Sequence, residues 1–144
     1  MAAADDMRAL VDQLYGTFAS GDSTVWSASA ADDVIGIGSD PDEWWEGRNV
    51  VTSIVTAQVQ ETREAGIRLV ADDPRIVEHG EVVWSVDRPV LHLGDGSEVP
   101  MRVTLIAVVE AGTLRLKHFH YSVGAGNEEV FRQGLTTEEP MSLG

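Results

Sequence analysis

The stretch of sequence that decides the fold is residues 99–123, which read VPMRVTLIAVVEAGTLRLKHFHYSV. Apolar side chains recur at every second position along much of both halves, which is the period of a β-strand with one buried face. Ala111 and Gly112 separate the halves and suit a tight turn. The stretch therefore predicts two long antiparallel strands, at residues 99–110 and 113–123, joined as a hairpin.

Upstream of this hairpin, the spacing of apolar side chains changes at residue 67, from the helical period to the period of two that is typical of strands. Strands are expected at residues 67–70, 75–79 and 81–93, the last of them bent by Pro89. Before residue 67 the period is helical, with apolar side chains spaced by three and four. Those that predict the first helix are Met7, Leu10, Val11, Leu14 and Phe18.

A short helix near Trp26, a strand at 34–37 and a longer helix at 47–65 complete the first half, and residues 127–133 are expected to add one helical turn. The main element order is thus α-α-β-α-β-β-β-β. Consecutive hairpins imply an antiparallel sheet, so we predict an α+β fold with the helices on one face of the sheet.

Length and charge limit what the protein can be. Its 144 residues suit one domain, with a core expected at about 5–124 and a C-terminal tail at 125–144. The chain has no cysteine, which excludes disulfides and thiolate metal sites. Ten Lys and Arg against 24 Asp and Glu give a formal charge of −14, which argues against nucleic acid and anionic membranes as partners.

The N-terminus lacks the basic and apolar regions of a leader peptide. The longest apolar run, residues 105–109, has five residues, far below the ~20 that a membrane-spanning helix needs. A cytoplasmic location is therefore expected.

Short motifs in a fixed order carry a family resemblance. A helix ending in Ala19-Ser20-Gly21-Asp22 is followed by Ala31-Asp32-Asp33 before a strand and by Trp45-Glu46-Gly47 at the start of a helix. With Arg102-x-Thr104 and the closing strand at 116–122, this order resembles the SnoaL-like branch of the nuclear transport factor 2-like superfamily, over about residues 5–124. The resemblance implies a cystatin-like cone, in which a strongly curved antiparallel sheet wraps around the N-terminal helices and leaves a pocket.

The superfamily includes ketosteroid isomerase, whose two catalytic side chains are missing at the matching positions. Spacing from Gly21-Asp22 places its helix tyrosine at Leu14, one residue before Tyr15. Spacing from Asp32-Asp33 places its aspartate at Gly38. The sequence therefore argues against the ketosteroid isomerase mechanism, while Tyr15 stays a candidate ligand-binding residue and the polyketide cyclases of the superfamily stay open.

His118 and His120 are the strongest candidates for catalysis. At i and i+2 in a strand, their side chains leave the same face, with Ser122 beyond them. If that face is concave, the imidazoles lie in the pocket and could move a proton or bind a ligand. The alternative is a pair of structural histidines. Two histidines without a third ligand do not make a metal site, so we expect no metal and no cofactor.

The register of the last hairpin decides whether Arg102 and Thr104 join the histidines. A three-residue loop at 110–112 places Thr104 opposite His118 and Arg102 opposite His120, all on one face. A two-residue loop at 111–112 turns Arg102 and Thr104 away. We expect the first register, because it pairs apolar side chains with one another. Arg102 could then stabilise an oxyanion, with Thr104 and Ser122 as further ligand-binding candidates.

Asp87 and two tryptophans are also expected at the pocket. A four-residue turn at 94–97 places Asp87 opposite Thr104, where its carboxylate could orient a histidine; otherwise it is an exposed strand-end charge. Trp44 and Trp45 are adjacent in a predicted loop, so one could roof the pocket while the other covers the helix start. They could equally be core aromatics. An aromatic lining would suit a small apolar or cyclic metabolite.

Two hypotheses for the function remain. The first is a small-molecule pocket protein that, as an enzyme, would act without a cofactor as an isomerase, cyclase, dehydratase or hydrolase. The second is a non-catalytic dimeric module that binds a ligand or associates with a protein. The resemblance implies a homodimer. We expect its contact on the outer sheet face, which the expected register assigns to Val103, Leu105, Ala107, Val109, Phe119 and Tyr121.

Overall fold

The helices form because their apolar side chains lie along stripes that the sheet can cover. In the computed structural model, which describes residues 3–140, α1 spans Ala3–Ser20, α2 spans Thr24–Ser29 and α3 spans Arg48–Glu64. Met7 and Leu14, on the stripe of α1, are fully buried. No helix among residues 3–140 has the length and hydropathy that crossing a membrane requires.

In the described part of the chain, the strands form a six-stranded sheet in the order β2-β1-β9-β8-β5-β4 and a three-stranded sheet in the order β3-β6-β7. Their bounds are β1 Ala30–Ile37, β2 Trp44–Glu46, β3 Arg68–Val70, β4 Arg75–His79, β5 Val82–Asp87, β6 Val90–His92, β7 Glu98–Pro100, β8 Arg102–Glu110 and β9 Thr113–Ser122.

The predicted α+β class is confirmed, and the helices and strands follow the predicted order with two differences. The strand β2 precedes α3, and the strands predicted at 81–93 and 99–110 are each divided in two, into β5 and β6 and into β7 and β8. The sheet is mixed rather than wholly antiparallel, because β1 and β9 pair in parallel. β2 was not predicted as a strand, since its three residues lie in a segment whose composition suggests a loop.

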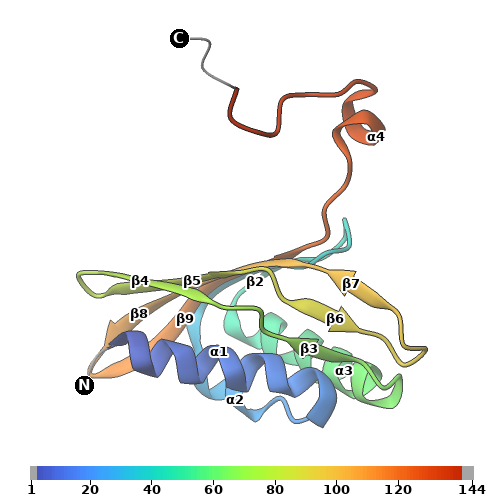
Figure 1. The fold of residues 1–144 in the computed structure, drawn as a ribbon. Helices are drawn as coiled ribbons and strands as arrows, with labels where there is room; N and C mark the ends of the chain where they lie inside the picture. Colours follow the sequence, from blue (N-terminus) through green and yellow to red (C-terminus); the bar gives the residue numbers. More distant parts are fainter. Residues whose placement is uncertain (1–2, 141–144) are drawn as a thin grey trace.

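The three main helices cover one face of the curved sheet. Figure 1 shows α1, α2 and α3 on one side, with the C-terminal segment that contains α4 (Asn127–Phe131) rising from the opposite side. We call the helix-covered side the inner face and the opposite side the outer face. Leu105 of β8 and Phe119 of β9 point to the inner face and belong to the core.

The turn between β8 and β9 has two residues, so the predicted three-residue loop is wrong. Glu110 pairs with Thr113 across Ala111 and Gly112. Both turn residues have positive φ, 50° and 77°, as in the two-residue turns that match the twist of a hairpin.

A bulge further along the hairpin then shifts the pairing. Beyond it, Thr104 lies opposite His120 and Arg102 lies opposite Ser122. The extra residue returns Arg102 and Thr104 to the face that carries the histidines. The prediction that Arg102 and Thr104 share a face with the histidines is therefore correct. The residue opposite each of them lies two positions further along β9 than predicted.

The shared face is the outer face, contrary to the expectation that the histidines point into the concave side. The alternate positions of β8 and β9 carry larger apolar side chains, and burying those removes more apolar surface from water. The six residues predicted to form the dimer contact are not on the outer face, for the same reason. They form the core or its margin on the inner face: Val103, Leu105, Ala107, Phe119 and Tyr121 are buried and Val109 is half-buried.

Asp87 also lies on the face opposite to the one predicted. His92 pairs with Glu98, so the loop between β6 and β7 has five residues rather than four. That one-residue difference carries along the hairpin, and Asp87 pairs with Val103 and is buried on the inner face.

Candidate functional site

A cavity of about 410 Å³ lies between the inner face, α3 and the loop that follows β1. Ser39, Glu61 and Ala65 are exposed and line its open end. The volume lies within the range of about 300–1,000 Å³ that is typical of small-ligand sites. Aromatic and apolar side chains form most of the wall, among them Phe18, Trp26, Trp45, Met101, Phe119 and Tyr121.

The ring of Phe119 forms the centre of the aromatic wall. It packs edge-on against Trp26, with ring centroids 5.1 Å apart, and against Tyr121 at 5.9 Å. Gly36 of β1 lies opposite Phe119, and a Cβ at this glycine would lie 2.1 Å from the ring. The aromatic wall therefore needs glycine at this position.

A carboxylate enters the cavity wall from the loop between β1 and β2. A Cβ on Gly38 would lie 2.6 Å from Oε1 of Glu43, so the missing side chain makes room for this acid. Oε1 accepts a hydrogen bond from the backbone N–H of Asp40 at 2.8 Å. Oε2 accepts one from the side-chain amide of Gln58 in α3 at 2.6 Å. These two donors fix the orientation of the Glu43 carboxylate.

The second chemical group in the wall is the phenol of Tyr121. Its ring lines the cavity, and its buried hydroxyl has no hydrogen-bond partner in the described structure. Burial raises the pKa of Tyr121 above its ordinary value, so the phenol keeps its proton at neutral pH. A buried donor without a partner is uncommon in folded proteins.

The comparisons with known proteins agree with this architecture. A family model described as the SnoaL-like domain matches residues 7–126. The chain belongs to this family. The resemblance seen in the sequence motifs is therefore confirmed. No curated protein sequence matches the chain.

Solved structures share the fold of this SnoaL-like domain at low sequence identity. An NTF2-like protein of unknown function from Pseudomonas putida is 16% identical, with 96% of each chain covered and a TM-score of 0.78. An uncharacterised protein with a cystatin-like fold from Caulobacter vibrioides is 16% identical over 92% of this chain and all of the other, with a TM-score of 0.75. A proposed ketosteroid isomerase from Parabacteroides distasonis is 12% identical over 85% and 89% of the two chains, with a TM-score of 0.70.

The histidines of this SnoaL-like domain lie outside the cavity. His118 and His120 project from the outer face, as do Arg102, Thr104 and Ser122, and the cavity wall contains none of the five. In the region from residue 3 to residue 140, no three His, Asp or Glu side chains are grouped so that they could hold a metal ion.

His118 is held against the backbone of β1. Its Nδ1 lies 2.7 Å from the carbonyl oxygen of Ile35, which fits an Nδ1–H that donates to this oxygen. The ring of His120, 6.4 Å away between centroids, is exposed. The structure thus brings the histidines together on the outer face, apart from the cavity.

Tyr15 and Asp87 meet in the interior, away from the other predicted site residues. The Tyr15 hydroxyl donates to Oδ2 of Asp87 at 3.1 Å. Oδ1 of Asp87 accepts from the backbone N–H groups of Arg88 and Asp73, at 2.8 and 3.2 Å. The pKa of Tyr15 is raised above its ordinary value, mainly by burial and to a smaller extent by the nearby Tyr121 and Asp87. Both carboxylate oxygens of Asp87 are thus occupied by bonds that join β5, α1 and the turn before β4.

The two adjacent tryptophans point to opposite faces because they lie in β2 rather than in a loop. Trp45 is buried and lines the cavity, as the roofing interpretation required. Trp44 is 62% exposed on the outer face. Only Trp45 of this pair can contact a ligand in the cavity.

Sequence reasoning missed Glu43 and Tyr121. Glu43 follows Ser39-Asp40-Pro41-Asp42, whose composition is that of a solvated turn. Tyr121 was assigned to the outer face by the expected orientation of β9. A signal for Glu43 was nevertheless present in the sequence. Gly38 stands where spacing places the aspartate of ketosteroid isomerase, and a glutamate that could replace this acid follows five residues later.

Proposed function

We propose that this SnoaL-like domain binds a small, largely apolar molecule in the cavity and transfers a proton on it without a cofactor. Glu43 is the base and Tyr121 is the hydrogen-bond donor. The observation that carries the proposal is the position of the Glu43 carboxylate, which occupies the space left by Gly38 in the cavity wall.

The character of the wall supports an apolar or cyclic ligand. Trp26, Trp45 and Phe119 offer flat apolar surfaces, while Glu43, Gln58 and Tyr121 are among the few polar groups. Sites for small molecules commonly combine an apolar wall with a few placed polar groups. The formal charge of −14 favours a neutral or cationic ligand over an anion.

The chemistry begins at Glu43. Its carboxylate would take a proton from a carbon next to a carbonyl group and return that proton at another carbon of the same molecule. No atom is gained or lost, so the product is an isomer of the substrate. The hydrogen bond from Gln58 keeps the carboxylate oriented toward the reacting carbon.

Tyr121 supplies the hydrogen bond to the carbonyl oxygen of the substrate. Negative charge develops on the carbonyl oxygen when the neighbouring carbon loses its proton, and a donor placed at that oxygen stabilises the charge. Tyr121 suits this role because its phenol stays protonated and its hydroxyl donates to no protein atom. A cyclisation or dehydration that begins with the same proton removal would use the same two groups.

The experiment uses probes that fit the expected chemistry. 1-Tetralone, a bicyclic ketone with one enolisable carbon, is incubated with the protein in D2O, and ¹H NMR follows loss of its α-proton signal. We expect the wild type to accelerate deuterium incorporation and Glu43→Gln to reduce the rate by at least tenfold. Glu46→Gln, an exposed acid of the neighbouring strand, serves as the matched control and should retain the rate.

Binding is measured separately, so that a non-catalytic function can be recognised. 1-Naphthol resembles the planar enol of 1-tetralone, and Trp26 and Trp45 should report its binding by fluorescence. Binding that Trp45→Phe weakens, with no exchange above the rate of Glu43→Gln, would favour the alternative of a ligand-binding module. Neither binding nor exchange would contradict the proposal for this class of ligand.

A further inference from the structure

The C-terminal arm, which we define as residues 125–140, leaves the domain without packing on it. Figure 1 shows α4 and the residues after it standing clear of the sheet on the side opposite the helices. No hydrogen bond or ion pair joins residues 125–140 to residues 3–124. Its apolar side chains are exposed: Val130 by 57%, Phe131 by 59% and Leu135 by 44%.

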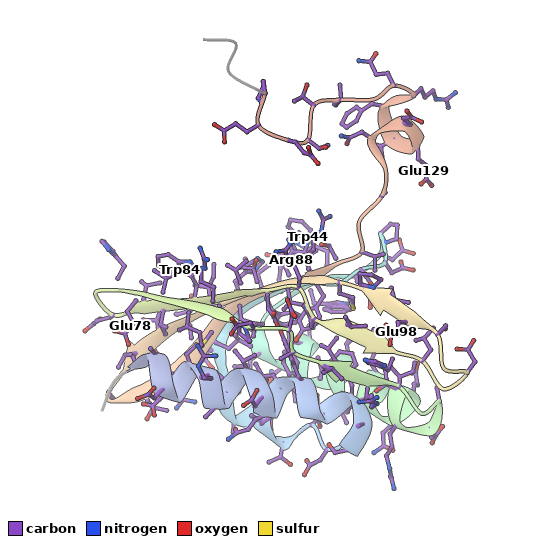
Figure 2. The ribbon with its side chains drawn as sticks, in the orientation of Figure 1. Trp44, Glu78, Trp84, Arg88, Glu98 and Glu129 are labelled. Carbon is purple, nitrogen blue, oxygen red and sulfur yellow. The ribbon has the colours of Figure 1, made fainter. Side chains whose placement is uncertain are left out.

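The outer face from which the arm rises is also unusually apolar. Trp44 is 62% exposed, Val86 46% and Ile35 37%. Trp84 and Ile106, which pair across β5 and β8, extend this surface between them. Figure 2 shows Trp44 and Trp84 on the same side of the sheet as the arm. An apolar surface of this kind on a soluble domain commonly marks a contact with another molecule.

The arm is acidic, whereas the outer face carries three exposed arginines. The arm carries one basic residue, Arg132, and four acids, Glu128, Glu129, Glu138 and Glu139. Arg75 and Arg102 project from the outer face at the ends of β4 and β8, where they pair with Val86 and Ser122. Arg88 points to the same side (Figure 2). These exposed arginines stand out in a chain with only ten Lys and Arg.

In the homodimer that the family resemblance implies, we propose that the C-terminal arm of each copy packs across the outer face of the other. The apolar side chains of the arm then cover apolar side chains of the partner's sheet. The glutamates of the arm lie near arginines of that sheet. The exchange is reciprocal, so one two-fold axis satisfies both arms and both faces.

The direction of the arm favours a second copy over the chain's own outer face. Gly124 still lies beside β8, because a Cβ added to it would be 3.9 Å from Cζ of Arg102. The chain then turns away from the sheet (Figure 1). An arm that points away from its own domain can meet a facing sheet without reversing. The apolar and charged surfaces needed on both sides of the contact are all present in this one sequence, and the inference does not depend on the chemistry of the cavity.

Sedimentation equilibrium of the full-length chain tests the role of the arm. We expect a dimer for the wild type and at least a tenfold rise in its dissociation constant for Phe131→Asp. Since Phe131 is exposed in α4, this change leaves the domain folded. Val50→Asp on α3 is the matched control: the side chain is 46% exposed on the helix side, and the dimer should persist. A monomeric wild type, or equal dissociation constants for wild type and Phe131→Asp, would overturn the proposal.

Cross-linking distinguishes a partner's arm from the chain's own arm, because the chain has no natural cysteine. One protein carries Leu135→Cys, and a second carries Thr104→Cys or Val86→Cys on the outer face. Mixed and treated with a short bis-maleimide, they should give a cross-linked heterodimer. A chain that carries both the arm and the face cysteine is then diluted in excess cysteine-free protein. Two results would contradict exchange between copies. One is a cross-link within the diluted double-cysteine chain, and the other is the absence of a cross-linked heterodimer with both face positions in the mixing experiment.

Discussion

The Glu43 carboxylate occupies the space that a side chain at position 38 would take, with Oε1 2.6 Å from an added Cβ on Gly38. Position 38 is where spacing places the catalytic aspartate of ketosteroid isomerase, and this chain has glycine there. The cavity nevertheless has a carboxylate at that point, supplied by a loop instead of by the strand. An acid at one location in a pocket can thus come from a different position in the sequence.

Replacing Gly38 tests this relationship. In Gly38→Ala, the new methyl group would displace Glu43, so we expect proton exchange on 1-tetralone to slow by roughly tenfold or more, about 1.4 kcal/mol in activation free energy. Gly16→Ala is the control, because nothing lies within 4 Å of a Cβ at this exposed helical position. It should keep the exchange rate and raise the free energy of unfolding by about 0.5–1 kcal/mol. Equal exchange rates for both variants would show that Glu43 takes no part.

Removing the hydroxyl should destabilise the protein at one of the two buried tyrosines and not at the other. Tyr15→Phe removes the donor to Oδ2 of buried Asp87, and we expect urea unfolding to show a loss of about 1–3 kcal/mol. Tyr121→Phe removes a hydroxyl that has no partner, so the free energy of unfolding should stay the same or rise. Proton exchange should instead fall in Tyr121→Phe. The account of both sites would be wrong if Tyr121→Phe were the more destabilising change.

Lys117 should control the titration of Asp33 on the surface. The hydrogen bond from Nζ of Lys117, 2.9 Å long, lowers the pKa of Asp33 below its ordinary value of 3.8. A lowered pKa means that the pair stabilises the folded state above the unfolded pKa, and that this contribution is lost as the pH falls through the folded value. In Lys117→Met, the NMR titration midpoint of Asp33 should rise.

Asp95 provides the control for that titration. Its pKa is lowered mainly by the side chain of Ser97 in the same turn, independently of Lys117. Its midpoint should therefore be identical in wild type and Lys117→Met. An unchanged Asp33 midpoint in the variant would show that Lys117 does not hold this carboxylate in solution.

The adjacent tryptophans of β2 should differ sharply in their effect on stability. Trp45 is 8% exposed in the cavity wall, so Trp45→Ala should cost about 3–5 kcal/mol of unfolding free energy. Trp44 is on the outer face, and Trp44→Ala in a monomeric background such as Phe131→Asp should change stability by only about 0.5 kcal/mol. Urea denaturation measures both, and similar losses would contradict the assignment of β2.

The sequence predicted the elements well because their signals are local. The apolar stripe of α1 and the alternation in β8 and β9 each follow from neighbouring residues, and the motif order identified the family. Pro89 ends the regular part of β5 as expected, since it cannot donate to the strand ladder. These features require no knowledge of distant contacts.

Orientation of the strands was harder to predict, because it depends on single-residue differences. A loop one residue longer than expected decided which face carries Asp87. A shift of one residue exchanges the two faces of a strand. The histidines are on the outer face because the alternate positions of β9 carry the larger apolar side chains, which are buried. The expectation that the histidine face of β9 is the concave one assigned Tyr121 to the outer face and left the true cavity wall unrecognised.

The most direct test of the central claim is a crystal structure of the protein with 1-naphthol. The account predicts the ligand in the cavity, packed against Trp45 and Phe119, with its oxygen about 2.6–3.2 Å from the Glu43 carboxylate or the Tyr121 hydroxyl. Ligand bound only on the outer face beside His118 and His120, with the cavity empty, would contradict it.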